Sequence, residues 1–263
     1  MDAPAKIPVA NLFSLKGRRG LITGGSMGIG ACLAEAFSEL GASVAIAARD
    51  LPRAEVKAAE IAAKTGGKVK AYQCDVADCA EADATVEAVV RDFGGIDFCI
   101  CNAGIFTGDG VLDISAEDFR KVLDVNLGGV FHVARAAARK MVEQGTGGSI
   151  IATASMSGHI VNRPQTIANY CASKAAVIQL VKAMAVELAP HRIRVNSVSP
   201  GYIQTELIAG LKDLLPVWQG MMPAGSRLGY PEDLIGAYVY FASDASRYAT
   251  GSDLVVDGGY TAL

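Results

Sequence analysis

A tyrosine and a lysine that could together move a proton lie four residues apart, at Tyr170 and Lys174 in "NYCASK". On a helix this spacing places both side chains on one face, with Cβ atoms about 5–6 Å apart. A free tyrosine has a pKa of about 10, and a neighbouring ammonium favours the phenolate and lowers that pKa. The pair predicts a proton donor tuned by a cation. Taken alone, the same spacing also fits a packed ring beside a lysine that reaches for solvent.

Ser155 and Asn126 are two further candidates for the same chemistry. Ser155 ends the apolar run "GSIIATAS", and the carboxyl ends of strands are where open α/β sheets bind ligands. Its hydroxyl could donate to a substrate oxygen and polarise it. Asn126 lies in "DVNLGG", a helical stretch with two glycines, which are poor helix formers. We expect a local distortion there that frees a backbone carbonyl to hold a water.

A glycine-rich turn, "TGGSMGIG" at 23–30, follows an apolar run and opens a helical pattern. Glycines permit a tight turn and the close approach of a pyrophosphate, and the helix N-terminus presents free N–H groups and a positive dipole end. The glycines Gly24, Gly28 and Gly30 are spaced more widely than in G-x-G-x-x-G, and no P-loop lysine follows. This context predicts a nucleotide site.

The residues after the second apolar run, "AIAARD", indicate which nucleotide is bound. An acidic residue at this strand tip would accept the ribose hydroxyls of NAD, but that place is Ala48. Arg49 follows, and a guanidinium can pair with a 2′-phosphate. The alternative is that Arg49 is a solvated loop charge and Asp50 binds the ribose. We expect NADP(H) to be preferred over NAD(H).

The elements that position these residues alternate along the whole chain. Apolar runs predict strands at 20–23, 43–48, 68–76, 96–104, 148–155, 193–200 and 253–259, and helical patterns lie near 28–40, 53–64, 79–93, 115–143, 169–189 and 232–243. Such alternation predicts an α/β fold, a doubly wound Rossmann-type parallel sheet of about seven strands with helices on both faces. We expect one domain over 1–263, with an N-terminal extension at 1–15 and a substrate lid at 205–228.

Composition narrows the possible partners and compartment. The net charge is -3 with interspersed signs, so neither nucleic acid nor a membrane surface is expected as a partner. No apolar run reaches about 18 residues, and no signal-peptide pattern opens the chain, so we expect a cytoplasmic protein. The six cysteines contain no C-x-x-C pair and are expected to be reduced thiols, and the three histidines form no metal pattern.

Seven motifs occur together in one order: "TGGSMGIG", "CDV" (74–76), "CNAG" (101–104), "DVNLGG" (124–129), "IIATAS" (150–155), "YCASK" (170–174) and "SPGYIQTEL" (199–207). From about residue 12 to the end, the chain resembles the short-chain dehydrogenase/reductase family, most closely its sugar-alcohol and ketose branch. The resemblance implies hydride transfer between NADP(H) and a carbonyl or secondary alcohol. It also implies that Lys174 holds the nicotinamide ribose, that a water at Asn126 links Lys174 to solvent, and that the protein is a homotetramer, or a dimer, with the helices near 115–143 and 169–189 at one interface.

The resemblance also assigns residues to the cofactor, all after predicted strands or at the start of the helices predicted near 28–40 and 169–189. They are Gly24, Ser26, Met27, Gly28, Ile29, Gly30, Arg49, Asp75, Val76, Asn102, Ala103, Gly104, Tyr170, Lys174, Pro200, Gly201, Ile203 and Thr205. The chain departs from the family pattern at Cys101, where the first of two asparagines is usual, and at Met27, where NADP-dependent members often carry a basic residue. Because Asn102 is retained, we expect the turn after the fourth strand to survive.

Substrate contacts are expected from the loop after Ser155 and from the 205–228 segment. His159 and Gln165, with Asn162, could reach substrate hydroxyls, and Trp218 could cap the substrate or pack at a subunit contact. Besides a ketose or polyol reductase, three functions stay open. They are a 3-oxoacyl carrier-protein reductase with a basic docking patch, a reductase of small hydrophobic ketones, and a nicotinamide-sensing binding protein without turnover, against which the presence of Tyr170 argues.

Overall fold

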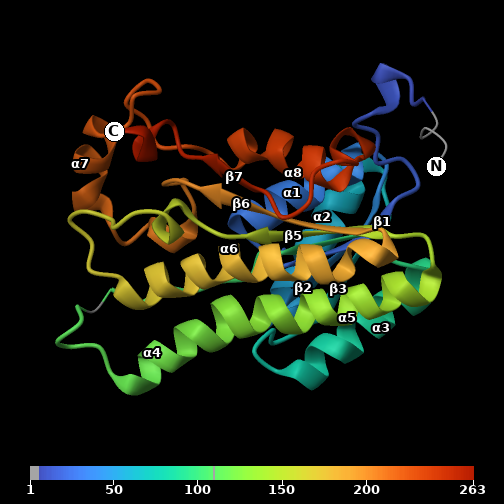
Figure 1. Ribbon diagram of the computed structural model, residues 1–263, viewed down its shortest axis with the longest axis horizontal. Coiled ribbons are helices and arrows are strands. Elements are labelled where there is room, and N and C mark those ends of the chain that lie inside the picture. Colours follow the sequence, from blue (N-terminus) through green and yellow to red (C-terminus); the bar gives the residue numbers. More distant parts are fainter. Residues whose placement is uncertain (1–5, 109) are drawn as a thin grey trace.

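The sheet of the computed structural model, which describes residues 6–108 and 110–263, has seven parallel strands in the order β3-β2-β1-β4-β5-β6-β7 (Figure 1). The strands are β1 Arg19–Thr23, β2 Ser43–Ala48, β3 Val69–Gln73, β4 Phe98–Cys101, β5 Gly148–Thr153, β6 Ile193–Pro200 and β7 Asp253–Val256. The order runs outward from β1 in one direction and from β4 in the other. The crevice between β1 and β4 is therefore the topological switch point, where doubly wound sheets bind ligands. The predicted Rossmann-type sheet is confirmed.

Helices cover both faces of the sheet. Figure 1 shows α1 (Gly28–Glu39) and α8 (Ile235–Ala242) on one face, and α5 (Gly129–Gln144) and α6 (Ala168–Leu188) on the other. The remaining helices are α2 Leu51–Thr65, α3 Cys79–Phe93, α4 Ala116–Leu123 and the short α7 Leu215–Gly220. No helix in the described ranges is long and apolar enough to cross a membrane.

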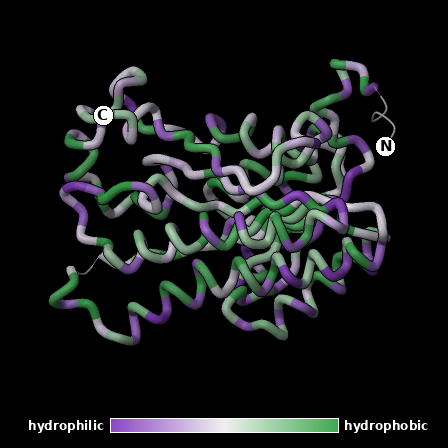
Figure 2. The backbone as a smooth tube through the Cα atoms, in the orientation of Figure 1, coloured by the Kyte–Doolittle hydropathy of each residue, from purple (hydrophilic) through white to green (hydrophobic). Residues whose placement is uncertain are grey.

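The strands are apolar on both faces because two helix layers bury them. Alternate residues of β1 show the pattern: Leu21 faces the core formed with α3, α5 and α6, and Ile22 faces the core formed with α1, α2 and α8. Figure 2 shows the hydrophobic residues gathered in the central strands and many hydrophilic ones along the outer helices. The strands β1, β2, β4, β5 and β6 contribute residues to both cores, and this packing fixes the loops that form the site.

The helix expected near 115–143 contains the distortion predicted at Asn126. α4 and α5 are joined by one turn of π-helix, Asp124–Gly128, in which the hydrogen-bonding pattern widens by one residue. Asn126 is completely buried within this turn. The distortion directs its side chain toward the loop after β4.

Two segments, 1–15 and 205–228, lie outside the regular alternation of strands and helices. Of the N-terminal extension, residues 1–5 lie outside the described residues. Leu15 is fully buried in the core, whereas Val9 and Phe13 are exposed. The 205–228 segment forms short helical turns and α7, at the same end of the molecule as the C-terminus (Figure 1). Trp218, Met222 and Leu228 of this segment pack with Met156, Tyr202 and Tyr260 in a third, smaller apolar cluster.

Candidate active site

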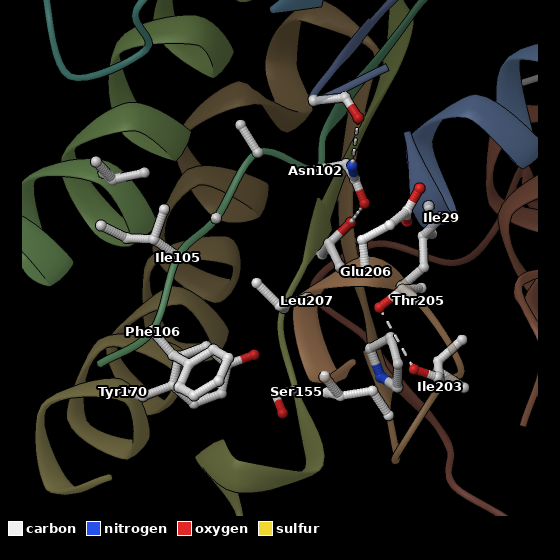
Figure 3. A pocket seen from close by; sticks show the side chains of 18 of the residues that line it. Ile29, Asn102, Ile105, Phe106, Ser155, Tyr170, Ile203, Thr205, Glu206 and Leu207 are labelled. Carbon is white, nitrogen blue, oxygen red and sulfur yellow. Dashed lines mark hydrogen bonds between the residues drawn. The ribbon is translucent and has the colours of Figure 1, made fainter. Parts of the chain in front are cut away.

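A cavity of about 1010 Å³ opens at the carboxyl ends of the strands and extends from the glycine turn to Tyr170. It is lined by all the residues expected at the cofactor except Gly30, and by Ser155 and Gln165. Asn126, His159 and Trp218 are not among the lining residues in the described part of the chain. Figure 3 shows Tyr170, Phe106 and Ser155 at one end of the cavity and Ile29 and Thr205 beside the glycine turn.

Lys174 lies under Tyr170 in the first turns of α6. It is 3% exposed, and its Nζ donates a hydrogen bond of 2.7 Å to the carbonyl of Thr153 at the end of β5. Nζ lies 5.6 Å from the centre of the Tyr170 ring. Burial lowers the pKa of Lys174 from 10.5 to about 8. Burial of the Lys174 ammonium therefore destabilises the folded protein, and other interactions in the fold compensate for this loss.

The pKa of Tyr170 differs from the expectation that Lys174 would lower it. Burial raises the pKa of the phenol, and a hydrogen bond with Ser155 opposes that rise. The net lowering expected from Lys174 is not found, because burial has the largest effect on the pKa of this phenol. A raised pKa keeps Tyr170 protonated at neutral pH, which suits a proton donor.

Ser155 is held at the start of a 3₁₀ turn, Met156–Gly158. Its Oγ accepts a hydrogen bond from the backbone N–H of Ser157 at 3.1 Å, and only 6% of the residue is exposed. The turn packs against the backbone of α6: a Cβ on Gly158 would lie 2.9 Å from the carbonyl carbon of Lys174. Glycine at this position allows the loop after β5 to bring Ser155 beside the Tyr170–Lys174 turn.

Asn126 joins the π-helical turn to the other elements of the site. Its Oδ1 accepts from the backbone N–H of Ile105 at 2.8 Å, and its Nδ2 donates to the Ile105 carbonyl at 2.9 Å and to the Ser173 hydroxyl at 3.1 Å. A Cβ on Gly104 would lie 3.3 Å from Asn126 Oδ1 and 3.6 Å from Lys174 Nζ. Asn126 thus holds the loop after β4 against α6, and the water relay stays a prediction.

The turn after β4 survives the presence of Cys101. Asn102 donates from Nδ2 to the Thr23 carbonyl at 3.1 Å and accepts at Oδ1 from the Thr153 hydroxyl at 3.2 Å. Its backbone N–H donates to Thr23 Oγ1. Figure 3 shows dashed hydrogen bonds at the Asn102 side chain. One asparagine therefore ties together the ends of β1, β4 and β5, and Cys101 is simply a buried strand residue.

The glycine turn fits a phosphate group. α2 and α3 begin with Asp50 and Asp78, whose carboxylates accept from first-turn N–H groups, but no side chain caps the N-terminus of α1. Free N–H groups with the positive dipole end form an anion site. A Cβ on Gly30 would lie 2.2 Å from the Gly24 carbonyl, so Gly30 is needed for packing the turn and does not line the cavity.

At the adenine end, Arg49 is exposed and lines the cavity. Asp50 caps α2 by accepting from the Arg53 N–H at 3.0 Å, so the alternative in which Asp50 binds the ribose loses support. Sequence reasoning missed Arg53 and Glu206, whose side chains pair at 3.6 Å and both line the cavity. The available signal was that Arg53 lies four residues after Arg49, on the predicted helix.

The Glu206 carboxylate lies close to the start of α1. A Cβ on Gly28 would be 3.6 Å from Glu206 Oε2, and it would be 3.3 Å from the Thr205 methyl group. Figure 3 shows Thr205 and Glu206 beside Ile29, so the beginning of the 205–228 segment crosses the glycine turn. A negative charge therefore already faces the anion site.

Two of the three expected substrate residues point elsewhere. The Nε2 of His159 lies 2.7 Å from an Asp253 carboxylate oxygen, which draws the ring toward β7 and away from the cavity. Trp218 is fully buried, with its ring stacked on Tyr202 at 3.9 Å between centres, so it cannot cap a substrate directly. Gln165 does line the cavity, together with Tyr202, which the sequence analysis had not singled out as a substrate residue.

The fold and the site together define a nucleotide-dependent oxidoreductase. A phosphate-binding turn and the residues Ser155, Tyr170 and Lys174 open into one cavity at the switch point of a Rossmann-type sheet.

Comparison with known proteins identifies the family. Residues 24–261 match the family model described as enoyl-(acyl carrier protein) reductase. The chain is 44% identical to a sorbose reductase of Candida albicans over 98% of this chain and 94% of that protein, and 44% identical to an NADP-dependent mannitol dehydrogenase of Alternaria alternata over 99% and 98%. A crystal structure of a short-chain type dehydrogenase/reductase from Mycobacterium marinum superposes with a TM-score of 0.95 at 54% identity, covering 97% of this chain and 100% of that one. The chain belongs to the short-chain dehydrogenase/reductase family and is an enzyme that acts on CH–OH groups.

Proposed function

We propose that this enzyme reduces the carbonyl group of a polyhydroxylated ketone to the alcohol with NADPH, and catalyses the reverse reaction with NADP⁺. The observation that carries the proposal is the single cavity that joins an uncapped α1 N-terminus and Arg49 to the Ser155–Tyr170–Lys174 group. The relatives named sorbose reductase and NADP-dependent mannitol dehydrogenase support the ketose substrate class and the cofactor.

The cofactor would lie along the carboxyl ends of the strands. Arg49, with Arg53 behind it, would pair with the 2′-phosphate, and the free N–H groups of α1 would hold the pyrophosphate. Pro200, Gly201, Ile203 and Thr205 line the part of the cavity suited to the nicotinamide. When bound, the reduced nicotinamide supplies a hydride to the carbonyl carbon.

Residues of the protein polarise and protonate the carbonyl oxygen of the substrate. Ser155 Oγ donates a hydrogen bond that polarises the carbonyl, and Tyr170 transfers its hydroxyl proton to the oxygen as negative charge develops there. The Lys174 ammonium stabilises the resulting phenolate. Asn126 holds the loop after β4 in place against α6. Solvent then returns the proton to Tyr170 by way of Lys174.

The competing functions receive less support from the described residues. A carrier-protein reductase would need a basic patch, but Arg135 and Arg139 pair with Asp83, and Lys140 with Glu143, outside the cavity. A sensor without turnover has no need of a buried lysine held beneath a tyrosine. Reduction of small hydrophobic ketones is favoured by the apolar lining residues Phe106 and Leu207 and is retained as the second candidate.

The loss of NADPH absorbance with a panel of ketoses, aryl ketones and acyl thioesters tests the proposal. Ketoses are expected to be the best substrates, with NADPH preferred over NADH. Absence of NADPH oxidation with every member of the panel would overturn the enzymatic role, and a best activity on acyl thioesters would overturn the substrate class.

We also propose that residues 1–263 act as one domain in a cytoplasmic homotetramer. A groove between α5 and α6, lined by Phe131, Val142 and Leu188 among others, supports assembly through these helices. Free thiols at all six cysteines support a reducing compartment. Light scattering coupled to gel filtration would measure the mass, and a monomer would contradict the assembly.

A further inference from the structure

Four side chains beyond Tyr170 form a series of hydrogen bonds with one direction, and three of them, Asn162, Tyr202 and Gln165, line the cavity. The Cys171 thiol donates to Asn162 Oδ1 at 3.8 Å, and Asn162 Nδ2 donates to the Tyr202 hydroxyl at 2.9 Å. The Tyr202 hydroxyl donates in turn to Gln165 Oε1 at 2.9 Å. Asn162 and Tyr202 each accept from the group before them and donate to the group after them. The donation from Cys171 therefore sets the orientation of Asn162, Tyr202 and Gln165.

The Cys171 thiol and the Tyr202 hydroxyl, which begin and continue this series of hydrogen bonds, stay protonated. Burial raises the pKa of the Cys171 thiol and the pKa of the Tyr202 phenol, so both groups remain donors at neutral pH. Asn162 is 2% exposed, and a flip of its amide would replace the donation from the Cys171 thiol to Oδ1 by a donation from Nδ2 to a weakly accepting sulfur, which is less favourable. Since Oε1 of Gln165 accepts from Tyr202, the amide's Nε2 remains available as a donor at the cavity wall, and it has no hydrogen-bond partner among the described residues.

The aromatic cluster of the 205–228 segment fixes Tyr202 in this role. The ring of Tyr202 stacks on Trp218 with centres 3.9 Å apart and planes 12° from parallel, and Tyr260 packs against it edge-on at 5.5 Å. Trp218 therefore acts on the cavity through Tyr202. A tyrosine held on both sides keeps its hydroxyl, and hence the Gln165 amide, in one orientation.

The charges around Gln165 limit the kind of substrate oxygen that its amide can bind. Met156 and Ile208, which pack with Tyr202, are apolar. Among the described lining residues, the charged ones other than Lys174 belong to the cofactor half: Arg49, Asp50, Arg53, Asp75 and Glu206. A neutral amide in such surroundings satisfies a hydroxyl oxygen but does not compensate the desolvation of a carboxylate.

We propose that Gln165 is the specificity-determining residue of the substrate pocket, donating from Nε2 to a hydroxyl oxygen of a neutral polyhydroxylated ketone, with Tyr202 and Trp218 as positioning residues. This inference rests on the proposed function and deepens it. It selects neutral ketoses over keto acids of the same length, and over ketones without hydroxyl groups.

Steady-state kinetics of Gln165 variants on three probes test this assignment: fructose, 2-hexanone and 5-ketogluconate. Gln165→Leu removes the donor and is expected to raise KM for fructose at least about tenfold, the loss expected for one unmade hydrogen bond in a closed site. Its kcat for fructose and its kcat/KM for 2-hexanone are expected to change less than about twofold. Gln165→Glu keeps the shape and replaces the donor by an acceptor, so it is expected to raise KM for fructose further. Tyr202→Phe is expected to act in the same direction more weakly, because it only frees the amide to turn.

Gln219→Leu is the matched control, because Gln219 is also half-buried, lies in the 205–228 segment and does not line the cavity. Equal losses for fructose and 2-hexanone in Gln165→Leu and Gln165→Glu would overturn the assignment, and so would a wild-type preference for 5-ketogluconate over fructose. Wild-type protein that oxidises NADPH with 2-hexanone but with no hexulose would instead overturn the proposed substrate class.

Discussion

Replacing Lys174 by methionine is expected to abolish turnover and yet stabilise the cofactor-free protein. Methionine keeps an unbranched apolar stem and removes the ammonium. Burial lowers the pKa of Lys174 from 10.5 to about 8, and at about 1.4 kcal/mol per pH unit the buried charge costs about 3 kcal/mol at pH 7. Loss of the hydrogen bond to the Thr153 carbonyl offsets about 1 kcal/mol of this. The variant should therefore gain about 2 kcal/mol in free energy of unfolding.

The sign of the pH dependence follows from the two pKa values. Below pH 8 both the folded and the unfolded wild type carry the proton, so the folded state bears the whole cost. Above pH 10.5 both are neutral and the cost is absent. Between these values the unfolded chain binds more protons, so wild-type stability rises with pH relative to the variant. The difference in free energy of unfolding between variant and wild type should shrink by about 2 kcal/mol between pH 7 and pH 9.5. It should therefore be close to zero near about pH 9.5.

Urea unfolding of both cofactor-free proteins at one protein concentration, from pH 7 to pH 9.5, measures this difference. Taking the difference between the two free energies of unfolding at each pH removes the contribution of titratable groups that both proteins share. Lys182→Met is the matched control, since Lys182 is exposed on the same helix, and it should show no gain at any pH. A stability difference for Lys174→Met that is independent of pH, or a variant less stable than wild type at pH 7, would refute the reasoning.

Three further variants test the remaining parts of the site. Tyr170→Phe should lower kcat at least about 100-fold, while the Kd for NADPH measured by fluorescence titration should change far less than kcat. Normal turnover would exclude Tyr170 as the proton donor. Arg49→Ala should raise the Kd for NADPH by about tenfold or more and leave the Kd for NADH unchanged, and an equal effect on both would exclude pairing with the 2′-phosphate. Glu206→Gln removes a carboxylate that faces the α1 N-terminus and should tighten NADPH binding about threefold to fivefold, whereas weaker binding would mean that its pair with Arg53 supports the bound state.

The sequence alone determined the elements and the backbone devices of this protein. Strand and helix periodicities predicted the seven strands and the helices that cover them, because hydrophobic patterns report which face of each element is buried. The Asn-Leu-Gly-Gly stretch predicted the distortion that is the π-helical turn at Asn126. The glycine turn and the Tyr170–Lys174 spacing are equally local, since each depends on residues within about two helical turns.

Only the tertiary structure decided where side chains from distant segments point and how buried they are. His159 meets Asp253 across 94 residues, and Tyr202 meets Gln165 across 37, so no local pattern could predict either pair. The pKa of Tyr170 rises because burial outweighs its neighbours, a balance that spacing along a helix does not reveal. Secondary structure follows from short-range periodicity, whereas orientation and desolvation depend on which distant surfaces the fold brings together.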